Sequence, residues 1–305
     1  MIIRGAFSDF YMTTMLPALR GVVSARYKEY PTQWDQIFDV QTSNRSIEQM
    51  SEFSGVGQFS TIGEGQAVRF DTPIQGFDKT FTHTRYGLGI QTSEDAVEDD
   101  KFSLIMKSHA DLAVSARDTQ EIDAASTINN GTSASYLGPD GKALFATDHP
   151  LYKAGGTQSN LGTAADLDIV SLQIALTDYR TQKDPAGRII NVPCQKLVVA
   201  PSNEWVAIEI TKSSMRPDTS NNAVNALKFG SKGMPTPFVW NYLTDPDAWG
   251  LFAPPADTGL VWFWRRKPYS KQWAEEATET GNYALRYKKS HGWYSFYGTY
   301  WNSGA

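Results

Sequence analysis

One segment restricts the possible folds more than any other, because residues 94–128 contain neither proline nor glycine. Ser93 is a good N-cap residue, and the acidic residues between Glu94 and Asp100 suit the positive end of a helix dipole. Apolar residues then recur on one side of a helix, and Asn129-Asn130-Gly131 provides a stop. The pattern predicts one helix about 50 Å long at ~1.5 Å per residue, about three times the usual length in globular domains.

The chain before this helix reads as an extended ribbon. Residues 67–91 contain two strand-like runs, with turn signals around Pro73 and Gly76. The second run is rich in threonine, and neither face of its distal half is strongly apolar. Because an isolated two-stranded ribbon is at best marginally stable in water, we expect another chain to support it. This ribbon is the first indication of assembly.

The rest of the chain mixes helices and strands, which predicts an α+β protein. Residues 8–28 read as an amphipathic arm with one short helix, split by Pro17. A long connection with one short strand covers 132–164, and a polar loop covers 213–235. Helices are expected at 166–183 and from Ser202, and strands at 196–200, 237–243, 248–253, 259–267 and within 282–301.

Composition argues against several classes of function. The chain has 28 Lys and Arg against 33 Asp and Glu, a formal net charge of −5, whereas a protein that grips a nucleic-acid backbone needs an excess of cations. The single cysteine, Cys194, excludes an internal disulfide and a site with several thiolate ligands. The chain has no apolar run long enough for a membrane span. Its first residues also lack the apolar run that a signal peptide contains.

Asp148-His149 is the pair that most resembles a catalytic or metal-binding site, since a carboxylate can orient an imidazole. A hydrolase or metal-dependent enzyme using these two residues is therefore the alternative hypothesis. The other histidines are scattered along the chain, however, and Pro150 makes a role in a turn sufficient. We expect no catalytic residue here.

Other motifs have equally simple explanations. The acidic run from Glu94 to Asp100 offers oxygen ligands for a divalent cation, but it also fits a solvated helix start. The Gly-x-Gly sequences lack the Lys-Ser/Thr of a phosphate-binding loop. Cys194 lies in an apolar stretch, as a small buried residue would. We therefore expect no cofactor and no metal.

Four phrases in this order resemble the major capsid proteins of tailed bacteriophages, which have the Hong Kong 97 (HK97) fold. They are GEGQAVRFDTPIQGFDKTFTHTRYGLGI leading into the long helix, LFATDHP, KLVVAPSNEWVAIEI and the terminal LRYKKSHGWYSFYGTYW. LFATDHP is similar to the corresponding phrase of Mu-like head subunits. The resemblance covers nearly the whole chain and implies an HK97-like α+β coat protein fold.

The resemblance also implies a division of the chain. It places an N-terminal arm at 1–31, a peripheral domain at 32–55 and 92–164 with the spine helix 94–129, an extended loop hairpin at 56–91, an axial domain at 165–270 and a return to the peripheral domain at 271–305. The hairpin would lie over a neighbouring subunit. Nothing ahead of the arm resembles a scaffolding segment, so we expect scaffolding to be a separate protein.

The implied function is structural. Copies of the chain would assemble in the host cytoplasm into pentamers and hexamers of an icosahedral virion shell around double-stranded DNA, without sequence-specific DNA binding. Portal, scaffolding and decoration proteins are the other implied partners, and no membrane is involved. An encapsulin-like shell that encloses a protein cargo remains an alternative, because the sequence features do not separate the two.

Basic residues of the hairpin and of later segments are candidates for contacts between subunits. The candidates are Arg69, Lys79, His83, Arg85, Arg216, Arg265 and Arg266. Arg265 and Arg266 follow an aromatic run and suit intersubunit salt bridges better than single-stranded nucleic acid. Lys79 is the only lysine of residues 56–91; in some relatives such a lysine forms a covalent cross-link to Asn, which needs a positioned carboxylate.

Overall fold

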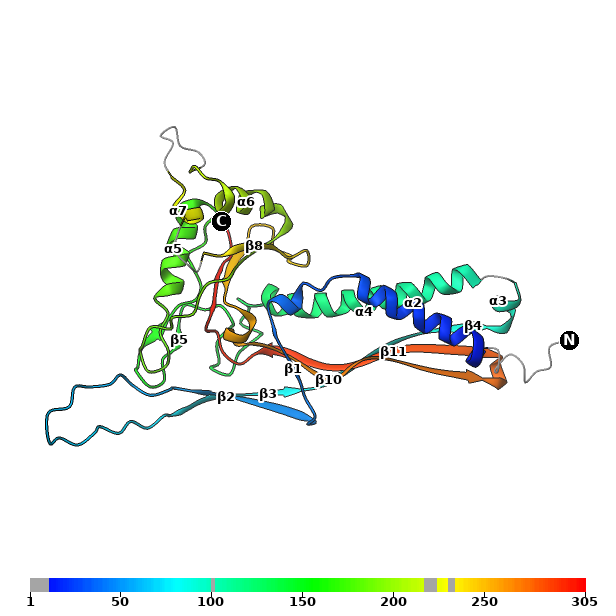
Figure 1. Cartoon of the computed structure of the whole chain (residues 1–305), viewed down its shortest axis with the longest axis horizontal. Coiled ribbons are helices and arrows are strands. Elements are labelled where there is room, and N and C mark those ends of the chain that lie inside the picture. The colour runs from blue at the N-terminus through cyan, green and yellow to red at the C-terminus, as the bar shows by residue number, and fades with distance from the viewer. Residues whose placement is uncertain (1–10, 100–101, 217–223, 230–233) are drawn as a thin grey trace.

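The computed structural model describes residues 11–99, 102–216, 224–229 and 234–305. The first part of the expected arm and residues 217–223 and 230–233 of the expected loop 213–235 lie outside the described residues; between them a short helix, α7 (Ala226–Phe229), replaces part of that loop. Figure 1 shows a long region built on a helix and a sheet, a second region beside one end of it, and a narrow hairpin that extends below both. The description below follows these three parts.

The long region is a four-stranded sheet with helices on one face. Its order is β1 (Asp39–Thr42), β10 (Leu260–Glu275), β11 (Thr280–Trp293) and β4 (Thr84–Ser93), with β1 parallel to β10 and the other pairs antiparallel. α3 (Glu94–Glu98) follows β4 directly, and the Ser93 side chain accepts a hydrogen bond from Ala96 N as its cap. The single helix expected over 94–129 is therefore divided, because α3 ends at Glu98 with Asp99 as its C-cap; the long helix is α4 (Phe102–Asn129), which ends where the sequence predicts.

The second region is another four-stranded sheet, in the order β12 (Thr299–Asn302), β9 (Trp249–Phe252), β7 (Lys196–Val199) and β8 (Thr236–Val239). α5 (Ile169–Arg180) and α6 (Glu204–Lys212) pack on one face of it, against Leu197 and Val199. Alternate side chains, such as Val198, point to the opposite face, where they join the core of the long region. The two regions thus share one hydrophobic core.

Short elements complete the chain. They are η2 (Trp34–Gln36), β5 (His149–Pro150), β6 (Thr157–Gln158), η3 (Pro201–Asn203), α7 (Ala226–Phe229), η4 (Pro255–Asp257) and η5 (Glu276–Thr278). Among the residues that the structure describes, no helix has the length and apolar character needed to cross a membrane.

Pro17 does not split the N-terminal helix, contrary to the sequence prediction. A π-helical turn, η1 (Tyr11–Met15), leads into α2 (Leu16–Glu29), and Pro17 lies in the first turn of α2. Proline is tolerated there because the first backbone N–H groups of a helix have no intrahelical partner. α2 runs along α4 and buries Leu19 and Val23 in that contact, so this segment has a partner within its own chain.

The predicted ribbon is also paired differently. β3 (Gln75–Thr82) is antiparallel to β2 (Ile47–Phe53), whereas β4 pairs with β11, and the chain passes from one sheet to the other at His83. Pro73 and Gly76 therefore do not join two strands. Gly76 lies inside β3, where a Cβ atom would overlap the Tyr152 ring, so this glycine permits a close approach of strand and side chain and marks no turn.

A buried ion pair joins α4 to the sheet. Lys289 on β11 is fully buried, and its Nζ lies 2.6 Å from Asp123 Oδ2 on α4. The same nitrogen lies 3.9 Å from the centroid of the Trp262 ring, and burial lowers the pKa of Lys289 to about 8. Trp262 in turn stacks on Trp34 with ring centroids 4.1 Å apart. The charge is thus held between a carboxylate and an aromatic cluster.

Removal of the Asp123 carboxylate should therefore destabilise the subunit strongly. Asp123→Ala leaves the Lys289 charge buried without its partner, and we expect a loss of about 3–5 kcal/mol in the free energy of unfolding. The double variant Asp123→Ala/Lys289→Met should lose clearly less free energy of unfolding than Asp123→Ala, because it no longer contains the buried lysine charge. Urea unfolding of the unassembled subunit measures both. Asp111→Ala, on the exposed side of α4, is the control, and a loss in Asp123→Ala no larger than in this control would refute the role.

Candidate assembly surface

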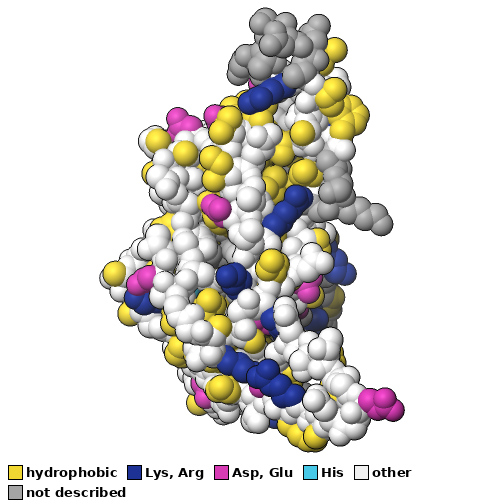
Figure 2. Space-filling model, turned by 90° about the vertical axis from the view of Figure 1, so that its left-hand side faces the viewer, with side chains coloured by type: hydrophobic (Ala, Val, Ile, Leu, Met, Phe, Trp, Pro, Cys, Tyr) yellow, Lys and Arg dark blue, Asp and Glu magenta, His cyan; other side chains and the backbone are white. Residues whose placement is uncertain are grey.

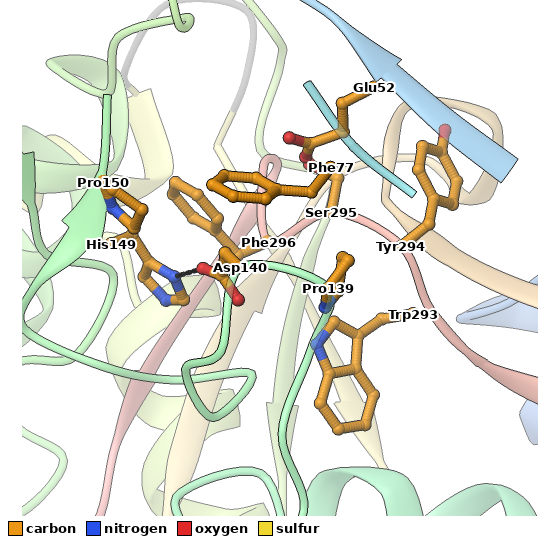
Figure 3. Close-up of a pocket in the computed structure, with 10 residues that line it drawn as sticks. All are labelled: Glu52, Phe77, Pro139, Asp140, His149, Pro150, Trp293, Tyr294, Ser295 and Phe296. Carbon is orange, nitrogen blue, oxygen red and sulfur yellow. Dashed lines mark hydrogen bonds and ion pairs between the residues drawn. The ribbon is translucent and has the colours of Figure 1, made fainter. Parts of the chain in front are cut away.

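The base of the hairpin is packed firmly against the rest of the chain. Figure 3 shows Glu52 of β2 and Phe77 of β3 beside the turn that follows β11, with Pro139 and Asp140 below them. The Phe77 ring meets the Tyr152 ring edge to face, with centroids 5.5 Å apart. Glu52 is buried and makes a side-chain hydrogen bond with Ser295. These contacts fix the direction in which the hairpin leaves the molecule.

His149 lies at this base, but its acidic partner is not the one that the sequence suggests. Its Nδ1 is 2.6 Å from Asp140 Oδ2, and its Nε2 is 3.1 Å from Asn160 Oδ1. The ring is buried and stacks on Phe296 at a centroid distance of 3.8 Å. Asp148 is paired instead with Lys142. The alternative hypothesis of an Asp148-His149 pair is therefore contradicted, because Asp148 lies outside β5 (His149–Pro150) and is bound by Lys142.

This arrangement leaves no room for a substrate. The cavity between Glu52, Asp140 and His149 holds about 10 Å³, which is about the space of one water molecule. Among the described residues, no group of three or more His, Cys, Asp or Glu side chains could hold a metal ion. His149 and Asp140 instead tie the loop before β5 to the turn after β11. The chemistry of the site is that of a structural joint.

Beyond this joint the hairpin opens into a loop without strand pairing. Residues 54–74 contain no strand, and Lys153 Nζ closes their base by donating to Asp71 Oδ2 at 3.0 Å and to Gly55 O at 3.2 Å. Gly57 N donates to Asp71 Oδ2 as well, at 2.6 Å. The hydrogen bond from the Gly57 amide and, next to it, the one from the Lys153 ammonium lower the pKa of Asp71. A carboxylate and a lysine thus hold the two arms of the loop together at their root.

The loop exposes large apolar side chains, which we name the loop face. Phe59 is completely exposed and Phe70 is 93% exposed. The other members of the loop face are Val56, Ile62 and Val68. Val56, Phe59, Ile62 and Val68 line a groove of about 540 Å³ that reaches the turn at 186–188, whereas Phe70 lies outside the groove. Soluble monomers rarely leave a contiguous apolar surface of this kind uncovered.

The sequence reading missed the loop face and treated the hairpin as polar. Its apolar residues carry neither a period of two nor an amphipathic helical pattern, because the loop is irregular. Phe59 and Phe70 lie on the two arms of the loop, which turns back at Gly63–Gln66, where Gln66 N donates to Gly63 O. The spacing of Val56, Phe59 and Ile62 was the available signal.

The second region carries further exposed apolar side chains on two helices. On α5 they are Val170 and Ile174, and on α6 they are Trp205 and Val206. α5 packs over β12 and β9, whereas α6 packs over β7 and β8, so the two helices lie at opposite edges of the sheet. Figure 2 looks onto the flank on which α5 lies, and hydrophobic side chains gather in its upper part. The two apolar surfaces thus lie over opposite edges of the same face of the sheet.

The predicted contact residues do not form one surface, and only three of them come together. Arg69 lines the groove of the loop face. Lys79 Nζ donates to Leu137 O at 3.2 Å, and His83 is buried between Ser43 and Ser290. The structure places Arg216 after α6, at the far end of the second region. Arg85, Arg265 and Arg266 come together with Lys288 around a shallow depression of about 320 Å³ on the long sheet.

Comparisons with known proteins identify what the chain is similar to. A family model described as phage capsid protein matches residues 77–302, which is well over half of the chain. A comparison with curated proteins found no match. The matched range includes most of β3, the long helix, every strand of the long sheet except β1, and the whole sheet of the second region.

Solved structures show the same fold at low sequence identity. The capsid of cyanophage P-SCSP1u has a TM-score of 0.55 and 9% identity, over 90% of this chain and 88% of that chain. The mature capsid of bacteriophage PhiM1 has a TM-score of 0.55 and 12% identity, over 90% and 87%. A virus-like particle from Pyrococcus furiosus has a TM-score of 0.50 and 10% identity, over 93% and 97%.

The joint predicts a pH dependence of stability. Burial raises the pKa of Glu52 from 4.5 to about 7, with a smaller contribution from Asp140, while the Ser295 hydrogen bond acts in the opposite direction. The folded state therefore keeps this proton to a higher pH than the unfolded state. The contribution of protonated Glu52 to the free energy of unfolding is complete below pH 4.5 and is lost as the pH rises through about 7.

Glu52→Gln cannot ionise, so its melting temperature should rise relative to the wild type between pH 5 and pH 8. The difference in unfolding free energy at pH 8 should be roughly 2–3 kcal/mol in favour of the variant. Thermal unfolding of the unassembled subunit over this pH range provides the measurement. Glu64→Gln at the exposed loop tip is the matched control. A constant difference across the range would show that Glu52 does not titrate there.

Proposed function

This chain belongs to the phage capsid protein family, and on that premise we propose that copies of it assemble into pentamers and hexamers of an icosahedral head around double-stranded DNA. The protein is a structural component of the virion, with the HK97-like fold, and not an enzyme. Its copies are proposed to assemble in the host cytoplasm. The mildly acidic chain fits a shell whose surface does not hold packaged DNA tightly.

The observation that carries the proposal is the loop face. Phe59 and Phe70 are held away from the core of their own chain on a loop whose base is fixed by Lys153. Burial of each phenylalanine against a second copy would contribute about 1.5–3 kcal/mol. A shell repeats this contact at every subunit. A modest favourable free energy per copy therefore becomes large when it is summed over the whole assembly. A second copy of the chain is therefore the proposed cover of the loop face.

The apolar flanks of the second region support rings. Val170 and Ile174 on α5 lie at one edge of the sheet, and Trp205 lies at the other edge. Two different surfaces on opposite edges favour a head-to-tail contact, in which one edge of a copy meets the other edge of the next. Such contacts close into rings when the rotation between copies allows it. Pentamers and hexamers are rings of this kind.

The domain division and the remaining partners belong to the same proposal. We keep the arm at 1–31 and move the end of the hairpin from 91 to 83 because β4 pairs with β11. We also move the boundary between the axial domain (expected at 165–270) and the return (expected at 271–305) to the start of β10 at Leu260, and we assign β12 (Thr299–Asn302) to the axial domain, because it lies in the sheet of the second region. Portal, scaffolding and decoration proteins are the proposed other partners. LFATDHP at 144–150 supports a place in the Mu-like branch.

A shell that encloses a protein cargo is the second candidate. The likeness to the virus-like particle from Pyrococcus furiosus favours it, because that match covers 97% of the other chain. The contents of shells purified from the natural source separate the two candidates. Double-stranded DNA supports the phage head, and a co-purifying enzyme supports the cargo shell.

Truncation of the loop face should abolish assembly without unfolding the subunit. We expect Phe59→Ser/Phe70→Ser to reduce the yield of shells at least about tenfold, since roughly 3–6 kcal/mol of burial per copy is lost. The melting temperature of the unassembled subunit should stay unchanged, because both rings are exposed there. Electron microscopy and sedimentation of protein expressed with its scaffold measure the yield.

Gln66→Ser, in the turn of the same loop, is the matched control and should assemble normally. Deletion of residues 56–71 should give the same loss of shells as the double variant. Normal shells from the double variant would refute the role of the loop face, and a wild-type chain that stays monomeric with scaffold present would refute the proposed function.

A further inference from the structure

Three cations stand directly opposite one another across the long sheet. Lys288 on β11 pairs with Arg85 on β4 in the strand register, and it pairs with Arg266 on β10 on its other side. The neighbouring pair, Tyr86 and Tyr287, stacks beside Asp123 of α4. Because side chains alternate between the faces of a sheet, the three cations lie on the face turned away from α4.

A fourth cation joins this group through an irregularity in β10. The register shifts between Trp264 and Arg266, which inserts Arg265 as an extra residue. We name Arg85, Arg265, Arg266 and Lys288 the basic row. All four line the depression of about 320 Å³. Arg85 and Arg266 are exposed, and both make side-chain hydrogen bonds with Tyr269.

The basic row is unfavourable for an isolated subunit. Like charges directly opposite each other in a sheet are destabilising. Within the described part of the chain, none of the four cations makes an ion pair with a carboxylate. Their own chain therefore does not neutralise them. Binding of an anionic partner molecule would therefore reduce the electrostatic repulsion among these four cations.

Carboxylates gather at the far end of the same sheet. Glu94 N at the start of α3 donates to Glu279 O in the turn between β10 and β11, and Ser93 pairs with Thr280. This brings α3 beside the end of β10, at the right-hand end of the sheet in Figure 1. Three exposed carboxylates there have no ion pair among the described residues. We name them the acidic tip: Asp95, Glu98 and Glu275.

The two charged groups cannot meet within one copy. Lys288 lies eight positions along β11 from Thr280 (288 − 280), which is ~26 Å at ~3.3 Å per residue. This separation is about three times the Debye length at physiological salt, so the two groups hardly interact within a subunit. Each copy thus presents a positive and a negative surface at a fixed spacing on one rigid sheet.

We propose that the basic row of one copy binds the acidic tip of another copy. This contact rests on the proposed function, because it needs assembly, and it adds a second surface to the loop face. Three or four carboxylate–guanidinium and carboxylate–ammonium pairs would relieve the repulsion inside both groups at once. The contact is head to tail, since it joins two different surfaces.

A carboxylate-bearing segment fits the basic row better than nucleic acid. The depression takes a few side chains, whereas duplex DNA is bound through rows of phosphate contacts along its length. The net charge of −5 would also repel a polyanion outside the immediate surroundings of the row. Nucleic acid is therefore an outcome that the experiment has to reject.

Charge exchange between the two surfaces tests the contact. The basic variant is Arg85→Glu/Arg266→Glu, and the acidic variant is Glu98→Lys/Glu275→Lys. Each should reduce shell formation at least about tenfold, because like charges then face each other between copies. The four-fold combination should recover assembly, since the charges are exchanged and still opposite. Arg266→Lys keeps the charge and serves as the control with normal assembly.

The basic variant has a second readout that a structural role would not give. Replacement of cations beside Lys288 turns cross-strand repulsion into attraction, so the melting temperature of the unassembled subunit should rise by roughly 1–3 °C while assembly falls. Wild-type assembly should slow with rising salt, because exposed charges are screened. Light scattering at several salt concentrations measures this rate.

Three results would overturn the inference while the proposed function stands. The first is normal assembly of the basic variant, and the second is a four-fold combination that is folded but does not assemble. The third is binding of a duplex DNA oligonucleotide to the wild-type subunit that the basic variant loses while it still forms shells. Failure of the wild type to assemble with scaffold would instead overturn both proposals.

Discussion

The rest of the structure depends on the contact between the long helix and the long sheet, where Lys289 is buried against Asp123 and Trp262. A charge in this position requires its carboxylate and its aromatic neighbours to stay in register, so it fixes how α4 lies on β11. The same cluster continues through Trp34 into the core that the second region shares. The helix and both sheets are thus oriented by one continuous interior, and the hairpin packs through Phe81 on a separate cluster with Val261 and Phe263.

The sequence predicted the parts that depend on neighbouring residues. The cap at Ser93 and the stop after Asn129 are local signals, and helices begin and end there; the end of α3 at Glu98 was not predicted, because no proline or glycine marks it. Strand pairing is not local, so the partner of β3 was not visible, and Gly76 looked like a turn although it makes room for Tyr152. His149 likewise reached Asp140 because folding, and not adjacency, decides which carboxylate it meets.

The surface differs from the interior in that several of its features are unfavourable for a lone chain. Exposed phenylalanines on the loop face and opposed cations in the basic row both raise the free energy of the isolated subunit. Both kinds of feature are attached to rigid supports, the hairpin base and the long sheet. A chain that folds firmly inside and leaves its surface unsatisfied gains stability from each neighbour that it acquires.

The loop between residues 54 and 74 has no ladder between its arms and is held mainly at its root by Lys153 and Asp71. Bending such a loop breaks few hydrogen bonds, whereas bending a paired ribbon would break one at every step. The slightly different angles between neighbours in five-fold and six-fold rings can then be absorbed at the loop tip. One amino-acid sequence thereby meets two local geometries, and the curvature of a closed surface leaves the cores of its subunits unstrained.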